Sequence, residues 1–130
     1  MTDFTRGLAQ CGARVIGLGE HPAGSLPWVV KQSLSDYLRV QSLVDTDSVL
    51  ATVRGCAAHT PIDRVECLWE PFMTLAAQLR EMLGLAGMHM AQTELFRDQK
   101  KMKDALDAAG LRTPRNTTAT GSDAIRAAAG

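Results

Sequence analysis

The chain has 130 residues, of which 45% are hydrophobic and 22% are charged, a balance typical of one folded domain rather than a disordered tail. Fourteen basic and fourteen acidic residues give a formal net charge of zero, so the composition does not indicate binding to nucleic acid or to an anionic membrane. No apolar run has the length of a bilayer span and no signal-like segment opens the sequence, so we expect a cytoplasmic protein without a membrane segment.

The first third of the sequence predicts a helix, a strand, a helical turn and a second strand. Residues 3–11 place apolar side chains at helical spacing and end at Gly12. The run RVIGLG at 14–19 is typical of a buried parallel strand, and its glycines mark the turn that leaves it. A single helical turn is expected over 28–32, followed by a short strand over 36–40.

The middle of the chain shows one sharp change of hydrophobic period. Asp45 or Thr46 is expected to cap a helix whose apolar stripe covers 49–57. Val65, Cys67 and Trp69 then occupy alternate positions of a short strand-like run. The apolar residues of 72–83 follow helical spacing instead. A strand leading directly into a helix is half of a βαβ unit.

The last part of the chain is expected to be mainly helical. A very short strand is predicted over 87–90, and Asp98 is expected to cap a helix over 99–109. Residues 115–120 are rich in threonine and are expected to be extended. Ser122 is expected to cap a final helix.

This order of elements predicts an α/β fold, a Rossmann-like three-layer sandwich with a parallel sheet. Folds of this type open with a central strand that delivers the first helix, whereas this sequence starts almost at the helix. Burying the three or four apolar side chains of such a strand contributes roughly 1.5 to 3 kcal/mol each, a large share of a domain's stability. We therefore expect the fold to lack its first strand and the chain to be a fragment.

The cysteines and histidines do not predict a metal centre. Cys11, Cys56 and Cys67 match neither a disulfide framework nor a zinc-site spacing, and each is expected to pack as a small buried hydrophobe. The three histidines share no metal-ligand spacing. We therefore expect this chain to contribute no metal ligand.

Two positions at strand ends are candidates for ligand contact. Gly17 and Gly19 are consistent with the start of a phosphate-cradling turn, but Pro22 interrupts the pattern, so an ordinary turn is the simpler interpretation. Glu70 lies at the carboxyl end of the predicted strand, where α/β folds bind ligands. An acidic cap on the following helix explains Glu70 equally well.

Four segments resemble the N-terminal part of ATP-grasp ligases of the biotin carboxylase and carbamoyl-phosphate synthetase type: VIGLGEHP, DYLRVQSL, IDRVECLWEPFM and FRDQKKMKDALDAAGLRTP. In the last and most specific of these, Asp98 opens a helix, Met102-Lys103 follows, and AGLRTP at 109–114 leads onward. The resemblance implies a preATP-grasp domain over 1–93 and the start of an ATP-grasp domain over 94–130.

The resemblance also implies a reaction and its cofactors. Members of this family use ATP and magnesium to activate a carboxylate or bicarbonate as an acyl phosphate, which an amine or similar nucleophile then attacks. Phosphoryl transfer of this kind depends on positioning and on neutralising charge. The resemblance places Gly17, Gly19 and Glu70 beside the substrate-side cleft, whereas the family's main ATP and magnesium ligands lie beyond this sequence.

One position in the matched region departs from the family pattern. The family has a lysine or arginine directly after the aspartate, where it contacts the nucleotide phosphates, but this chain has Gln99. Lys100 lies one position further and faces about a quarter-turn round the helix. Gln99, Lys100 and Lys103 are therefore the candidates for cofactor contact, although a run of lysines is also typical of a solvated helix face.

We therefore interpret the chain as an N-terminal fragment of an ATP-grasp ligase, not active alone, whose partner is the remaining ATP-grasp domain or a separate chain. The alternative is a non-catalytic α/β protein-interaction module, in which unpaired strand edges would favour self-association. A flavodoxin-like or receiver-type domain is a weaker alternative, because it requires acidic or glycine-rich loops that this sequence lacks at its predicted strand ends.

Overall fold

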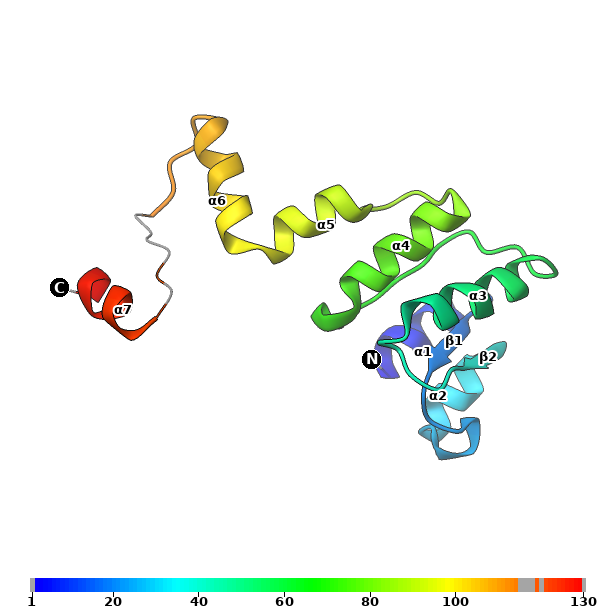
Figure 1. Ribbon diagram of the computed structural model, residues 1–130. Helices are drawn as coiled ribbons and strands as arrows, with labels where there is room; N and C mark the ends of the chain where they lie inside the picture. The colour runs from blue at the N-terminus through cyan, green and yellow to red at the C-terminus, as the bar shows by residue number, and fades with distance from the viewer. Residues whose placement is uncertain (1, 115–118, 120, 130) are drawn as a thin grey trace. The chain divides into compact units, whose positions relative to one another are not determined.

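A computed structural model describes residues 2–114, 119 and 121–129 and confirms an α/β fold with a parallel sheet. The chain forms two compact units, Met1–His89 and Met90–Gly130 (Figure 1). The first unit contains, in chain order, α1 (Thr2–Gln10), β1 (Ile16–Gly19), the 3-10 helix η1 (Ala23–Ser25), α2 (Trp28–Ser33), β2 (Asp36–Arg39), α3 (Thr46–Ala57), the 3-10 helix η2 (Glu70–Phe72) and α4 (Met73–Leu83). The second unit contains α5 (Met90–Arg97), α6 (Gln99–Ala108) and α7 (Ser122–Ala129).

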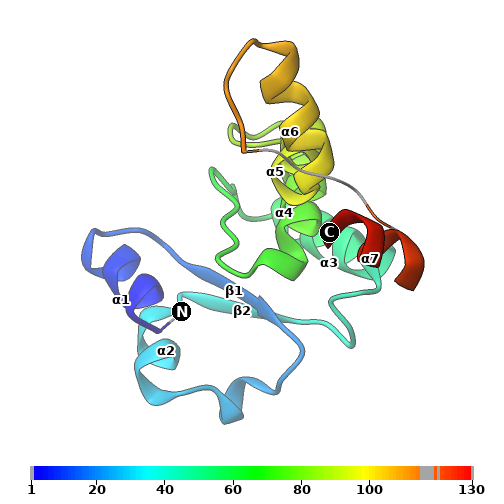
Figure 2. The same cartoon turned by 90° about the vertical axis from the view of Figure 1, so that its left-hand side faces the viewer.

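The sheet of the first unit consists of β1 and β2, which pair in parallel with Ile16 opposite Asp36 and Gly19 opposite Arg39. Figure 2 shows α1 and α2 on one side of the two strands and α3 and α4 on the other. This is the helix, sheet, helix layering expected for a parallel sheet, whose two faces both need covering. The layering agrees with the predicted sandwich.

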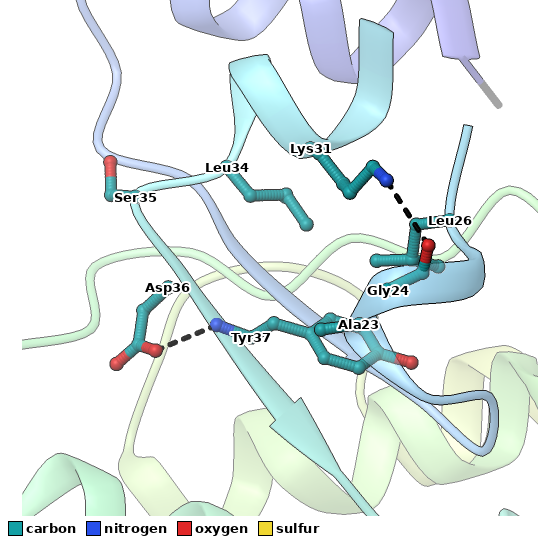
Figure 3. A pocket seen from close by; sticks show the side chains of 8 residues that line it. All are labelled: Ala23, Gly24, Leu26, Lys31, Leu34, Ser35, Asp36 and Tyr37. Carbon is teal, nitrogen blue, oxygen red and sulfur yellow. Dashed lines mark hydrogen bonds between the residues drawn. The ribbon is translucent and has the colours of Figure 1, made fainter. Parts of the chain in front are cut away.

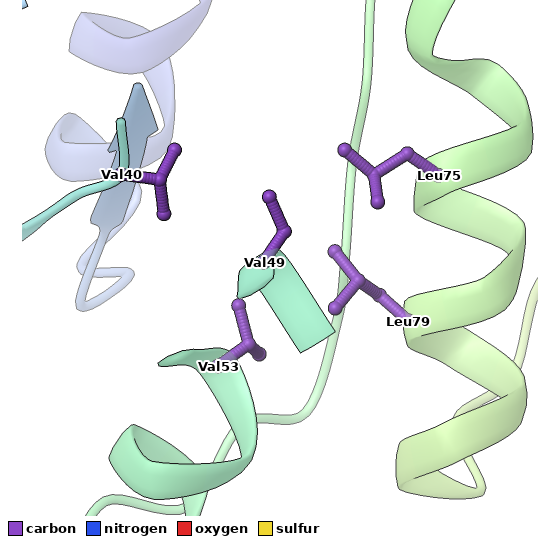
Figure 4. Close-up of a cluster of buried hydrophobic side chains, with 5 residues drawn as sticks. All are labelled: Val40, Val49, Val53, Leu75 and Leu79. Carbon is purple, nitrogen blue, oxygen red and sulfur yellow. The ribbon is translucent and has the colours of Figure 1, made fainter. Parts of the chain in front are cut away.

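The core of the first unit joins the end of β2 to α3 and α4. Its buried side chains are Val40, Val49, Val53, Leu75 and Leu79, and Figure 4 shows the two α3 valines between Val40 and the α4 leucines. The α3 pair and the α4 pair are each spaced by four residues, so one face of each helix is apolar. Each buried side chain contributes about 1.5 to 3 kcal/mol, which fixes both helices against the sheet.

Local sequence signals explain where α3 and α4 begin and end. The Asp45 side chain caps α3 by accepting a hydrogen bond from the Ser48 N–H at 3.2 Å. Gly84 ends α4 in the left-handed region at φ 65°, a conformation that a residue without Cβ adopts at little cost. The Leu85 N–H then donates to the Arg80 carbonyl at 2.9 Å and closes the turn.

Three predictions about the first unit are wrong. Residues 65–69 do not form a strand: Val65 and Cys67 are half-buried between exposed neighbours, as in a strand, but no other strand pairs with them in the described part of the chain. No strand forms over 87–90 either, because Gly87 has φ 133° and α5 begins at Met90. Cys11, predicted to be buried, is exposed, since it follows the last turn of α1.

The second unit matches the predicted helices more closely but adds one. α6 begins at Gln99 behind the predicted cap, Asp98, whereas α5 was not predicted. Ser122 is the first residue of α7 rather than a cap outside it. The expected extended segment at 115–120 falls outside the described residues except for residue 119. Among the described helices, none combines the length and apolar character needed to cross a membrane.

Candidate functional site

The loops that follow β1 and β2 meet at the carboxyl end of the sheet, where α/β folds place their ligands. The Arg39 Nε donates to the Glu20 carbonyl at 3.2 Å, and the Leu43 N–H donates to the Glu20 carboxylate at 2.6 Å. Glu20, directly after β1, therefore ties the loop after β1 to the loop after β2. Sequence reasoning missed this residue, whose only signal was an acidic side chain next to Gly19.

Gly17 and Gly19, both predicted for the substrate-side cleft, lie in β1 under the ring of Tyr37. A Cβ on Gly17 would lie 2.9 Å from side-chain carbons of Tyr37 and Leu34, and one on Gly19 would lie 2.6 Å from Tyr37 Oη. The Tyr37 hydroxyl donates to the His21 carbonyl at 2.9 Å. Burial raises the pKa of Tyr37, while the nearby Arg39 charge lowers it. The two glycines thus make room for an aromatic ring, and their role at a cleft stays a prediction.

A shallow hollow of about 320 Å³ lies beside this ring, between η1, α2 and the start of β2 (Figure 3). Two of its polar groups already have partners: Lys31 Nζ donates to the Gly24 carbonyl at 3.1 Å, and the Tyr37 N–H donates to Asp36 Oδ1 at 2.7 Å. Its remaining lining is largely apolar. None of the predicted site residues lines the hollow.

Glu70 is the first residue of η2 and is exposed, at the point where the chain enters α4. The rings of Trp69 and Phe72 stand edge to face beside it, with centroids 5.2 Å apart. A carboxylate at this place fits the positive end of the helical segment, as one of the two sequence interpretations held. Its contact with substrate stays a prediction.

The first turn of α6 carries the three residues predicted to contact the cofactor. The Asp98 carboxylate accepts hydrogen bonds from the Lys100 and Lys101 N–H groups at 2.9 and 3.1 Å, so the helix N-terminus is already capped. The Lys100 ammonium lies 2.6 Å from the Asp104 carboxylate. This hydrogen bond, and the attraction of the same charge, raise the pKa of Lys100.

The two other candidates differ from Lys100. Gln99 is exposed and Lys103 is half-buried, and neither side chain forms a hydrogen bond or an ion pair with another residue that the structure describes. Lys101, by contrast, pairs with Glu94 at 2.7 Å. Among these lysines, Lys103 therefore has the ammonium group with the least local competition for a phosphate.

Arg80 is a buried charged residue that the sequence interpretation overlooked. It is 8% exposed, and its guanidinium donates from Nε to the Val65 carbonyl at 2.9 Å and from Nη1 to the Met88 carbonyl at 3.1 Å. Its Nη2 lies 3.7 Å from the Glu66 carboxylate. Arg80 thus fastens the extended segment before η2 and the loop after α4 to one helix. An arginine four residues after Ala76, within the apolar stripe, was the signal.

No group of three or more histidine, cysteine, aspartate or glutamate side chains within the described ranges is arranged to hold a metal ion. Magnesium that is bound together with ATP is commonly held by one or two carboxylates and the phosphates, a smaller set of protein ligands than such a group.

A family model described as the ATP-grasp N-terminal domain matches residues 9–87. No curated protein matches the sequence. Among solved structures, the crystal structure of an L-amino acid ligase from Bacillus licheniformis is similar, with a TM-score of 0.71 and 24% sequence identity. The match covers 85% of this chain and 28% of that one, so this chain spans about a quarter of the ligase's length. At this identity the similarity shows the fold.

Proposed function

Because this chain belongs to the family of ATP-grasp N-terminal domains, we propose that it is the N-terminal part of an ATP-dependent ligase that joins a carboxylate to an amine. The family match over residues 9–87 carries this proposal. In such a reaction a substrate carboxylate oxygen attacks the γ-phosphorus of ATP and releases ADP. An amine then attacks the acyl phosphate, inorganic phosphate leaves, and the amine loses a proton. Biotin carboxylase-like chemistry on bicarbonate is a second form of the same activation.

This chain would contribute the substrate-side cleft, through Gly17, Gly19 and Glu70, and one edge of the ATP site. At that edge we assign Lys103 as the first phosphate contact, because its ammonium has no carboxylate partner among the described residues. Lys100 would have to exchange Asp104 for a phosphate oxygen. ATP and magnesium belong to the complete enzyme, and the remaining ATP-grasp domain, in the same or a separate cytoplasmic chain, would supply the metal ligands.

Two measurements on the 130-residue chain test this role. Phosphate release in the presence of ATP, magnesium and mixed L-amino acids should stay at the background rate. Turnover by this chain alone would overturn the proposal that the remaining ATP-grasp domain is required for activity. Titration with millimolar magnesium-ATP, followed by NMR, should shift the amide signals of residues 99–103. Lys103→Gln should weaken those shifts, whereas Lys31→Gln, a charge change in the other unit, should not. Shifts confined to other residues would contradict the assigned edge.

A further inference from the structure

The guanidinium group of Arg39 lies at the carboxyl end of the sheet, beside the loop that follows β1. Arg39 is the last residue of β2 and stands opposite Gly19, the last residue of β1. The helix after β1, α2, lies on one face of the sheet, and the helix after β2, α3, lies on the opposite face (Figure 2). The carboxyl end of the strands is where folds of this class bind their ligands, so a charged group fixed there is a candidate for ligand contact.

The side chain of Arg39 is exposed but held in place. Its Nε donates to the main-chain carbonyl of Glu20 at 3.2 Å, and the Glu20 carboxylate accepts from the Leu43 N–H at 2.6 Å. Burial raises the pKa of Tyr37 and the Arg39 charge lowers it, so the guanidinium lies close to this ring. An arginine anchored in this way loses less side-chain entropy when it binds a ligand than a mobile surface arginine does.

The two terminal amino groups of this guanidinium are available to a ligand. Neither Nη1 nor Nη2 of Arg39 forms a hydrogen bond or an ion pair with another residue that the structure describes. The main-chain N–H groups of Gln41 and Ser42, which follow β2, also form no hydrogen bond within the described ranges. Unused donors of two kinds therefore occur together at the end of β2, and donors of both kinds bind anions.

The charges near Arg39 favour one kind of anion. The loops over 20–27 and 40–45 contain no lysine or arginine, whereas Glu20 and Asp45 each add a negative charge. A phosphate group carries about −1.5 to −2 charges at neutral pH, so these carboxylates would repel it more strongly than a singly charged anion. A carboxylate carries one charge, and its two oxygens match the planar fork of a single guanidinium.

We propose that Arg39 binds the carboxylate group of a small ligand through two parallel N–H···O hydrogen bonds from its Nη groups. Glu20 is a positioning residue in this site, because its main-chain carbonyl directs the guanidinium. Gln41 and Ser42, the next residues but one and two along the chain, supply further N–H donors near the bound group. The proposal does not rest on the proposed ligase role, because recognition of a carboxylate requires neither ATP nor magnesium.

NMR of the 130-residue chain tests this binding with acetate as the probe. Millimolar sodium acetate replaces sodium chloride at constant ionic strength, without ATP, and should shift the Arg39 Nε–H signal and the amide signals of Gln41 and Ser42 in a saturable manner. Inorganic phosphate at the same ionic strength should shift these signals less. The internal control is Arg54, an exposed arginine of α3 without an ion pair in the described part of the chain, and its Nε–H signal should not saturate.

Three variants test the role of each group. Arg39→Lys keeps the positive charge but removes both the Nε anchor and the fork, so the affinity for acetate should fall by roughly fivefold or more. Arg54→Lys is the matched control and should leave this affinity unchanged. Glu20→Gln keeps an acceptor for the Leu43 N–H and removes a negative charge, so acetate should bind roughly twofold more tightly.

Several results would overturn the proposal. These are the absence of saturable shifts at the Arg39 signal, equal affinity in Arg39→Lys, equal saturation at the Arg54 signal, and weaker binding in Glu20→Gln. Tighter binding of phosphate than of acetate would overturn the choice of a carboxylate. If Arg39→Lys did not fold, as judged from the dispersion of its amide signals, the Arg39 and Arg54 side-chain signals of the wild type would decide.

Discussion

Replacing Arg80 with methionine should destabilise the first unit strongly, because it removes a buried donor while keeping much of the apolar stem. Two carbonyl groups, those of Val65 and Met88, lose a charged partner. A hydrogen bond to a charged group contributes about 1.5 to 3 kcal/mol. Val65 is half-buried and Met88 is exposed, so we expect their carbonyl groups to recover some of that from water. We therefore expect the free energy of unfolding to fall by about 2 to 4 kcal/mol.

The Glu66 ion pair should account for little of this loss. The two charges lie 3.7 Å apart and the Glu66 side chain is 52% exposed, so solvent screens the pair. Exposed pairs contribute about 0 to 1 kcal/mol, and Glu66→Gln should cost no more than that. Because the loss in Arg80→Met comes from the carbonyls, the two variants should differ clearly.

Urea unfolding followed by circular dichroism measures both variants and the wild type, and thermal unfolding gives a second value. For a unit of this size, each kcal/mol lowers the midpoint by roughly 4 to 8 °C, so Arg80→Met should unfold roughly 8 to 32 °C lower. If Glu66→Gln is as damaging as Arg80→Met, the ion pair rather than the two carbonyls holds the segment. An unchanged midpoint for Arg80→Met would refute the role of Arg80 in fastening the two segments to α4.

Two further predictions concern the sheet and α6. Gly17→Ala places a Cβ 2.9 Å from the Tyr37 ring and should lower the free energy of unfolding by about 1 to 3 kcal/mol, as measured by urea unfolding. Gly24→Ala is the control: its Cβ would have nothing within 4 Å, so the free energy of unfolding should hardly change. Asp104→Asn should lower the pKa of Lys100 toward its ordinary value, as measured by NMR titration, because the carboxylate raises it now. The contribution of this pair to folding stability is present at neutral pH and is lost as pH rises through the folded-state pKa of Lys100. If Asp104→Asn changed stability only in the acid range, this reasoning would be contradicted.

Local signals were sufficient for most elements of the first unit. The apolar stripes and the cap at Asp45 placed α3, and the change of period after residue 70 placed α4. Both strands of the sheet were predicted because short apolar runs lie between turn-forming residues. These features depend on neighbours within a few residues, which a sequence displays directly.

Features that depend on distant partners were not predicted. Residues 65–69 have the side-chain alternation of a strand, but a strand also needs a hydrogen-bonded neighbour, and alternation does not report one. α5 was missed because Met90 has no capping residue before it and Gly87 suggested a turn into a strand. The contacts of Arg80 with Val65 span fifteen positions, and the helix pattern alone does not show them.

The packing of Tyr37 also makes the sheet open to direct observation. Tyr37 is the only tyrosine in the sequence, and its ring lies across β1 while its backbone belongs to β2. Biosynthetic replacement of tyrosine by a fluorinated analogue would therefore give one fluorine resonance, located where the two strands meet. Because the hydroxyl is anchored on the loop after β1, that resonance would also report when the loop at the carboxyl end of the sheet changes conformation. A single spectral line thus becomes a local probe of strand separation and loop movement in this domain.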